Sequence, residues 1–298
     1  MIAKTVCFSN SGKLSVKSGQ LVWSPSAGEA AALPIEDIGM ILIESPAVGL
    51  SSALLSILAE NKVSVVLCDS SHTPSAQMLP ISASATSFET TEAQLAASEA
   101  VARRLWRSVV RQKIRNQSEV LSRMELPGRN RLLALADATK NGDPSNCEGQ
   151  AARIYFQALM PSGVTRERFG DWPNAPLNYG YSILRAATAR ALVSAGLVCF
   201  CGIHHHNRYN AFALADDIME PFRPFVDQYV FGKEEPFAPP SPSLTSEMRK
   251  TLLQVLTCDV QIQSKRHPLQ IALTLVASSL AKYFLKQSDK ILLPGFCK

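Results

Sequence analysis

The spacing of hydrophobic positions divides the chain into a strand-rich first part and a helical remainder. Within the first 75 residues, short runs rich in β-branched and aromatic residues alternate with Ser, Gly and Pro turn signals. The runs predict strands at 4–8, 13–16, 21–23, 39–44 and 63–68, and one helix at 52–61. We therefore expect a small β-rich domain that carries a single helix.

The pattern changes after a stretch of small polar residues at 76–90, which has the composition of a linker. Beyond it the apolar positions keep helical spacing. They predict helices at 101–121, 149–159, 177–195, 211–225, 244–256 and 268–284. A proline-rich segment, 233–242, is predicted to be an extended surface loop. The expected fold class is α+β, with a β-rich domain at 1–75, the linker, and an all-helical domain at 91–298.

Length and composition indicate an ordinary folded protein. Its 298 residues can bury a sizeable core in two domains, and 46% hydrophobic with 18% charged residues is usual for soluble domains. The first residues lack the features of a signal peptide, and the apolar stretch at 271–280 is too short to span a bilayer. We expect a cytoplasmic protein that does not enter a membrane.

The seven cysteines indicate reduced thiols rather than disulfides. Their number is odd and no Cys-x-x-Cys is present. Cys199 and Cys201 lie close to a histidine cluster, so zinc has to be considered. Two side chains at i and i+2 point to opposite sides of a strand, and the usual zinc spacings are missing, which disfavours a zinc site.

Positive charge is concentrated in the middle of the chain. The net charge is only +5, but residues 103–131 contain nine basic residues against two acids. Within this segment, arginines recur along one helix face: Arg104, Arg107, Arg111 and Arg115. Such a stripe can simply be a solvated face. Because no acids interleave with these arginines, a polyanionic partner, DNA, is the favoured interpretation.

Acids and histidines in the second half could carry chemistry. Glu148 opens a predicted helix, and one interpretation is that this acid only complements the helix dipole. Three consecutive histidines occupy 204–206, and neighbouring side chains diverge, so at most two could serve one site. Asp217 and Glu220 share one helix face among apolar residues, an expensive position unless a cation or donor pairs with them.

Two carboxylates and an imidazole together would form a mixed oxygen and nitrogen site that suits Mn²⁺ or Mg²⁺. A cation in such a site can polarise a scissile phosphate. The chain has neither the Gly-x-x-x-x-Gly-Lys-Ser/Thr phosphate loop of many ATPases nor the Gly-x-Ser-x-Gly elbow of serine hydrolases. On residue chemistry alone, the sequence favours a metal-dependent nuclease.

Four segments in this order resemble the CRISPR-associated spacer-acquisition integrase ("Cas-one") family: residues 146–156, 176–185, 202–205 and 214–224. The resemblance implies that Glu148, His205 and Glu220 are the catalytic metal ligands. The family places its histidine fifteen residues before the acid, which selects His205 and leaves His204 as the second choice. It also implies supporting roles near the metal or DNA for Asp217, Asn178, Tyr179 and Arg153.

The length and the Gly-Ile-His-His-x-Asn pattern are most similar to type II members of that family. The resemblance implies dimerisation through the β-rich domain and assembly of two homodimers with a dimer of the small "Cas-two" partner, and other type II adaptation proteins can join them. The implied reaction inserts double-stranded DNA fragments as new spacers. The fragment's 3′-OH attacks a phosphodiester at the leader–repeat junction of the CRISPR array, and water in its place gives endonuclease activity.

Three alternatives stay open at this point. One keeps the family but makes the protein a stand-alone structure-selective nuclease or a transposon-type integrase, the latter disfavoured because no appended DNA-binding module is evident. Another is a non-catalytic DNA-binding scaffold, in which Glu148 is only a helix-start acid. The third is a metabolic metalloenzyme.

Overall fold

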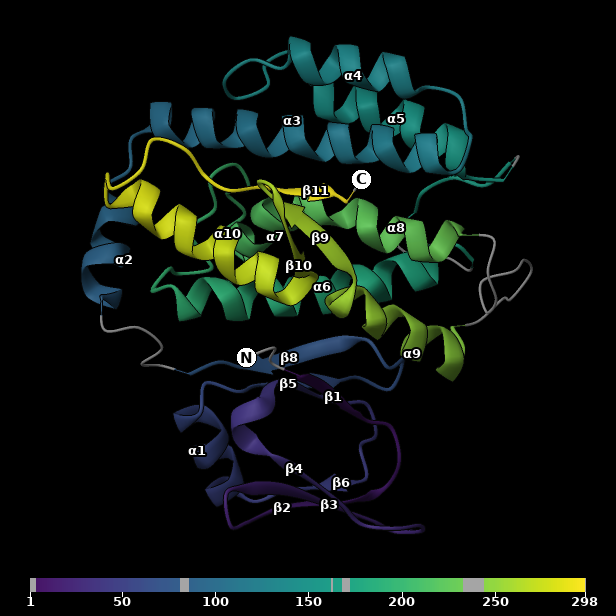
Figure 1. Ribbon diagram of the computed structural model, residues 1–298, viewed down its shortest axis with the longest axis vertical. Helices are drawn as coiled ribbons and strands as arrows, with labels where there is room; N and C mark the ends of the chain where they lie inside the picture. Colours follow the sequence, from purple (N-terminus) through teal and green to yellow (C-terminus); the bar gives the residue numbers. More distant parts are fainter. Residues whose placement is uncertain (1–3, 81–85, 162, 168–171, 233–243, 298) are drawn as a thin grey trace.

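The β-rich first part and the helical second part form two stacked regions in the computed structural model (Figure 1). The structure describes residues 4–80, 86–161, 163–167, 172–232 and 244–297. The first part contains β1 (Lys4–Phe8), β2 (Gly12–Lys17), β3 (Gln20–Pro25), β4 (Ala31–Pro34), β5 (Ile38–Ile43), β6 (Val48–Gly49), α1 (Ser52–Glu60), β7 (Ser64–Cys68) and β8 (Pro74–Met78). The strands and the helix predicted from the hydrophobic pattern are confirmed to within about two residues, a scatter usual for element ends.

These strands form two sheets. One has the order β1-β5-β7-β8, with β1, β5 and β7 parallel and β8 antiparallel, and the other has the order β4-β3-β2-β6. Every residue of β5 is buried, because its side chains alternate between two cores. Ile41 and Ile43 pack toward the second sheet and α1, whereas Met40 and Leu42 belong to the core of the helical part. The first sheet therefore carries the helical part on its outer face.

Strand β8 lies partly in the segment that the sequence assigns to a linker. It pairs with β7 through Val65 to Cys68, so the β-rich region extends to Met78. Its composition is small and polar, which hides it from a hydrophobic pattern. The Gln77 side chain explains why a polar residue is favoured: its amide donates to Ser64 Oγ at 2.7 Å and to the Ala186 carbonyl at 2.9 Å.

The helical part is built around two long helices, α3 and α6 (Figure 1). The helices are α2 (Ser87–Leu95), α3 (Glu99–Arg123), α4 (Arg129–Ala138), α5 (Cys147–Leu159), α6 (Asn174–Ser194), α7 (Ala213–Met219), α8 (Arg223–Phe231), α9 (Ser246–Leu253) and α10 (Leu269–Phe284). The sequence pattern predicts neither α4 nor α2, and α2 begins inside the segment assigned to the linker. The loop predicted at 233–242 lies outside the described residues. In the part of the chain that the structure describes, every helix is too short or too polar to cross a membrane.

The helix predicted at 211–225 is interrupted. Helix α7 ends at Met219, a turn of 3-10 helix covers Glu220–Phe222, and α8 begins at Arg223. Pro221 and Pro224 account for the break, since proline has no N–H for the helical ladder and clashes with the preceding turn. The interruption places Glu220 at the junction of two helices instead of inside one.

The prediction of an all-helical second part is wrong in one respect. A small antiparallel sheet of order β10-β9-β11 packs on α10 and α3, with β9 at Asp259–Ile262, β10 at Lys265–Pro268 and β11 at Pro294–Phe296. Strands of three or four residues give too short a pattern to separate from loops. The sheet helps to fix the Glu220 turn, because the buried Asn116 amide on α3 donates to the Pro221 carbonyl at 2.6 Å and to that of Pro294 at 3.0 Å.

Candidate active site

Lys113, on the inner face of α3, joins two of the predicted metal ligands. Its Nζ lies 2.6 Å from Glu148 Oε1 and 2.5 Å from Glu220 Oε2. The Lys113 side chain is 11% exposed, and those of Glu148 and Glu220 are 24% and 5% exposed. Three elements distant in sequence, namely α3, the start of α5 and the α7–α8 junction, thus place two carboxylates around one positive charge.

The local sequence explains why Glu148 can point at Lys113. Asp143 caps helix α5, with its carboxylate accepting from the backbone N–H of Cys147 at 2.8 Å and of Glu148 at 2.9 Å. The Asn146 side chain accepts from Gly149 N at 3.0 Å. The first N–H groups of the helix are therefore satisfied by other side chains, and the Glu148 carboxylate is not needed as a cap.

Glu220 is a buried carboxylate held in its charged form. Its Oε1 lies 3.0 Å from Arg223 Nε, while Oε2 has its ion pair with Lys113 and no further hydrogen-bond partner among the described residues. Burial raises the Glu220 pKa, but the charges of Arg223 and Lys113 outweigh it and the net shift is downward. Burial likewise opposes the charge on Lys113, whereas Glu220 and Glu148 raise its pKa. Both net shifts favour the charged form, of Glu220 and of Lys113.

Asp217, fully buried, organises the histidine loop. Its carboxylate accepts from the backbone N–H of Ile203 at 2.7 Å, His204 at 2.9 Å and His205 at 3.3 Å. The His205 ring also bonds to it, with Nδ1 at 2.5 Å from Oδ1. This hydrogen bond is the main cause of the raised His205 pKa. With Nδ1 directed at Asp217, the other ring nitrogen, Nε2, is left for a ligand.

Close packing fixes the loop further. A Cβ on Gly202 would lie 2.4 Å from the His205 carbonyl oxygen and 2.8 Å from Asp217 Oδ2, so the turn admits only glycine. Trp106 on α3 stacks on the His204 ring with 4.0 Å between centroids, and its edge meets His205 at 5.9 Å. His204 is thereby held against α3, and His205 is the histidine whose ring bonds to Asp217.

The structure brings Glu148 and Glu220 together but leaves His205 on Asp217. Within the described ranges, no three His, Cys, Asp or Glu side chains are grouped as a metal site would need. The position between the two carboxylates is taken by the Lys113 ammonium, which shows that these oxygens can surround a cation. Two carboxylates with an imidazole nitrogen nearby are a donor set that fits Mn²⁺ or Mg²⁺.

The four residues predicted to support the site do not all lie near it. Asp217 does, as described. Asn178 accepts from Arg166 Nη2 at 2.6 Å and borders a cavity of about 330 Å³ that Lys113 also lines. Tyr179, one residue on, points the other way: its hydroxyl donates to Glu44 Oε1 at 2.6 Å in the contact between the two regions of the fold. Successive helical residues differ in direction by about 100°, which separates the two.

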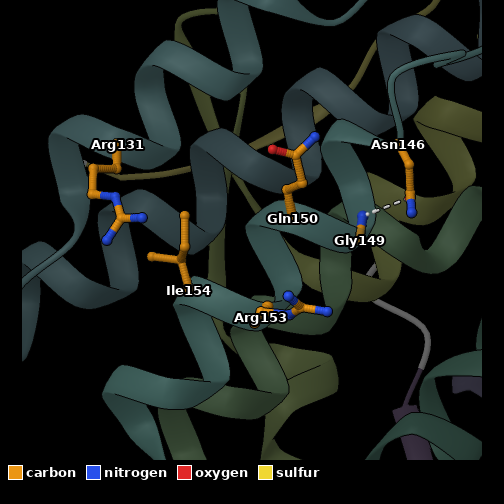
Figure 2. Close-up of a pocket in the computed structure, with 6 residues that line it drawn as sticks. All are labelled: Arg131, Asn146, Gly149, Gln150, Arg153 and Ile154. Atoms are coloured by element: carbon orange, nitrogen blue, oxygen red, sulfur yellow. Dashed lines mark hydrogen bonds between the residues drawn. The ribbon is translucent and has the colours of Figure 1, made fainter.

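Arg153 lines a different pocket, on another face of α5 than Glu148. Figure 2 shows it with Arg131 from α4 on the rim of a pocket of about 400 Å³. The pocket is lined by Arg131, Asn146, Gly149, Gln150, Arg153 and Ile154, with no acid among them. Both arginines are exposed. The hollow is a cationic surface that begins one residue beyond Glu148.

The arginine stripe of α3 is more neutral than its sequence indicates. Arg111 and Arg115 each donate to Asp137 Oδ1 at 3.1 Å, and Arg107 donates to the Thr139 carbonyl at 3.1 Å. The missing acid is supplied by α4, a helix that the sequence pattern did not reveal. Of the four arginines, only Arg104 has an exposed side chain without a side-chain contact among the described residues, so self-repulsion within the stripe is not an argument for DNA.

The sequence pattern does not single out several residues of the site. Lys113 counted only as one charge in a basic segment, off the arginine stripe. Its signal was indirect: two acids in apolar surroundings require a nearby cation. Trp106 and Arg223 also went unassigned, although Arg223 is the cation three residues after Glu220.

Asp227, on α8, is a buried acid that lines the cavity of about 330 Å³ together with Lys113 and Asn178. Its ionisation predicts how the stability of the protein depends on pH. It accepts from the hydroxyls of Tyr155, at 2.9 Å, and Tyr181. Burial is the main cause that raises its pKa from 3.8 to about 6, against the opposing effect of those hydrogen bonds. The folded state therefore binds this proton more tightly than the unfolded state. The stabilisation is complete below about pH 4 and is lost as pH rises through 6. From pH 5 to 7 we expect a loss of about 1 kcal/mol in the free energy of unfolding.

Urea unfolding of the wild type and Asp227→Asn at pH 5 and at pH 7 measures this loss in the free energy of unfolding. The asparagine cannot titrate, so the variant should show a pH dependence shallower by that amount. Equal slopes in the two proteins would contradict the assignment.

Comparison with known proteins gives one family. The model of the family described as "CRISPR associated protein Cas1" matches residues 6–233. The CRISPR-associated endonuclease Cas1 of Neisseria meningitidis is 35% identical over 281 residues, covering 94% of this chain and 91% of the relative. A second relative, from Pyrobaculum aerophilum, is 29% identical over 68% of this chain and 73% of its own length.

Solved structures show the same fold. A casposase bound to integration product superposes with a TM-score of 0.80 at 21% identity, covering 98% of this chain and 92% of that one. A CAS1 protein from Thermotoga maritima gives a TM-score of 0.73 at 17% identity, covering 99% and 100%. The β-rich region followed by a mainly helical region is thus the architecture of these proteins.

Proposed function

Because this chain belongs to the Cas1 family of CRISPR-associated proteins, we propose that it is a metal-dependent DNA endonuclease and integrase of CRISPR adaptation. The observation that supports this most directly is the meeting of Glu148 and Glu220 around one cation position, with the His205 loop beside it.

Glu148, Glu220 and His205 Nε2 are the groups that would hold Mn²⁺ or Mg²⁺. When bound, the metal supplies a Lewis acid that polarises a phosphodiester and stabilises the leaving oxygen. The protein contributes orientation. Asp217 fixes the tautomer of His205 through Nδ1, and Arg223 keeps Glu220 ionised, so that both present lone pairs.

The proposed reaction is transesterification. The 3′-OH of a double-stranded fragment forms the new phosphodiester at the leader–repeat junction, and the 3′ oxygen on the other side of the attacked phosphate leaves with a proton. One phosphodiester is exchanged for another, so no external energy source is required. Water in place of the 3′-OH gives cleavage, the activity named for the Neisseria meningitidis relative.

The test is a joining assay with labelled DNA and a repeat-containing target, run with Mn²⁺, with Mg²⁺ and with EDTA. Fragments ending in a 3′-OH should join, and matched fragments ending in a 2′,3′-dideoxynucleotide should not. Joining and any cleavage should both stop in EDTA. Joining in EDTA would contradict metal dependence, and cleavage without joining would reduce the proposal to a nuclease. The assay should be run with and without a small Cas2-type partner, since one structural neighbour comes from a "Cas6-RT-Cas1--Cas2 complex".

We further propose that the protein works in the cytoplasm as a homodimer held through the β-rich region, and that this dimer assembles with the small partner. We also propose that it belongs to a type II CRISPR system. The similarity to the Neisseria meningitidis relative over most of both chains supports the subtype. Light scattering with and without the partner measures the assembly directly.

The pocket of Figure 2 predicts a DNA contact. Arg131 and Arg153 flank it beside the first turn of α5, where a strand that reaches Glu148 would pass. Replacing both with alanine removes two charges available to phosphates. The slope of log K against log salt should become shallower by about 1.8 on duplex DNA, with weaker binding at every salt concentration. Fluorescence anisotropy at four or five salt concentrations gives this slope.

The matched control replaces two exposed lysines elsewhere, Lys250 on α9 and Lys265 on β10, and should leave the slope nearly unchanged. Equal effects of both pairs would mean that only net charge matters and that the pocket has no special role.

A further inference from the structure

Lys113 is placed where the metal of the proposed function would sit. Its Nζ bridges Glu148 Oε1 at 2.6 Å and Glu220 Oε2 at 2.5 Å, so it occupies the space between the two oxygens most suited to bind a divalent ion. A lysine ammonium and a metal ion cannot share that space. The side chain is only 11% exposed, which makes this a built-in arrangement and not a surface ion pair.

The cavity beside Lys113 offers a second position for its ammonium group. Lys113 also lines the cavity of about 330 Å³ that contains Gln117, one helical turn further along α3. The Gln117 Oε1 atom is buried and has no hydrogen-bond partner among the described residues, while the residue is 2% exposed. A buried carbonyl oxygen without a partner is unusual and calls for a donor. Residues at i and i+4 are neighbours on a helix, so the Lys113 ammonium can reach it by rotating its side chain.

We propose that Lys113 is an internal counter-ion that holds the catalytic carboxylates together without metal and is displaced toward Gln117 when metal binds. Lys113 then acts as a positioning residue that keeps two like charges at a fixed spacing and prevents them from repelling each other. It also competes with the metal, so the affinity of the site is set partly by the lysine. This inference rests on the proposed function, because it requires that Glu148 and Glu220 bind the metal.

The first test measures Mn²⁺ binding by the electron paramagnetic resonance signal of free Mn²⁺, without any DNA. Lys113→Met keeps the length of the side chain and removes its charge. The variant should bind Mn²⁺ about ten-fold more tightly than the wild type, because the metal no longer has to displace the ammonium, a change within the usual range of coupling free energies. The matched control, Arg111→Met, removes a charge from the same helix at a side chain that pairs with Asp137 and not with the carboxylates, and should change the affinity less than two-fold.

The second test follows the lysine itself in the wild-type protein, so it does not depend on a variant folding. Brief acetylation with an activated ester, read by mass spectrometry, reports the reactivity of each lysine. Adding Mg²⁺ should raise the acetylation of Lys113 several-fold, because the amine leaves the two ion pairs that occupy it. Lys250 and Lys265, both exposed, serve as internal references and should not change.

The outcomes separate this inference from the proposed function. If Glu148→Gln abolishes Mn²⁺ binding but Lys113→Met leaves it unchanged or weakens it, the competition is wrong and the metal site stands. Unchanged acetylation with Mg²⁺ bound would show that Lys113 stays in place, which also overturns the displacement. If the wild type and Glu148→Gln bind Mn²⁺ equally, the metal site itself is misassigned and both proposals fail.

Discussion

Replacing Glu148 with alanine is expected to lower the rate of 3′-OH joining by at least about a thousand-fold, equivalent to about 4 kcal/mol of transition-state stabilisation. The carboxylate lies against the cation position with Glu220, and the neighbouring Asp143 carboxylate is engaged with the first N–H groups of α5. Mn²⁺ binding should be lost in parallel. The overall stability should change little, because Asp143 and Asn146 cap the helix.

The control addresses the alternative that Glu148 only complements a helix dipole. Glu99 is also a first-turn acid, on α3, with a basic partner in Arg103 at 2.6 Å, and its side chain is 78% exposed. Glu99→Ala removes a dipole-complementing acid without touching the site and should cost less than about 1 kcal/mol of stability with joining unchanged. If Glu148→Ala behaves like Glu99→Ala and retains metal-dependent joining, the catalytic role is refuted and a binding scaffold becomes the better explanation.

The fold was predictable where one physical signal dominated. Strand β5 reads as an unbroken apolar run because it is buried on both faces, and the long helix α6 shows its period over many turns. The failures share a cause: the information was not in local hydrophobicity. Strand β8 is stabilised by a polar side chain that reaches another domain, and β11 is too short to show a period. The α7–α8 junction depended on prolines, whose effect outweighs the pattern around them.

The candidate site shows a similar division. Residue types and motif resemblance brought forward Glu148, Glu220 and His205, and the structure places the first two around one charge. Lys113 could not be selected, because a lysine in a basic segment carries no sign of which way it points. Tyr179 shows the converse error. The family resemblance implies a place near the site, but helix geometry turns the Tyr179 hydroxyl to Glu44.

Replacing Asp217 with asparagine is expected to give the second large effect, on stability and activity together. The buried carboxylate accepts from three backbone N–H groups and from the His205 ring. An amide has one acceptor oxygen and places an NH₂ group against donors, so part of this set is left unsatisfied. We expect a loss of about 3 kcal/mol in the free energy of unfolding, measured by urea denaturation. Joining should fall by about 10- to 100-fold, as for other partners of a metal-binding histidine.

The pattern of rescue separates the two effects. If Asp217 acts by aiming His205, raising the Mn²⁺ concentration should restore much of the joining rate of Asp217→Asn while its stability stays low. If the loop simply collapses, no metal concentration will restore it. Asp259→Asn, an exposed acid on β9, is the matched control and should change neither quantity. Full stability and joining in Asp217→Asn would mean that the Gly202–His205 turn is held by its own packing, including the Trp106 stack, and not by the buried charge.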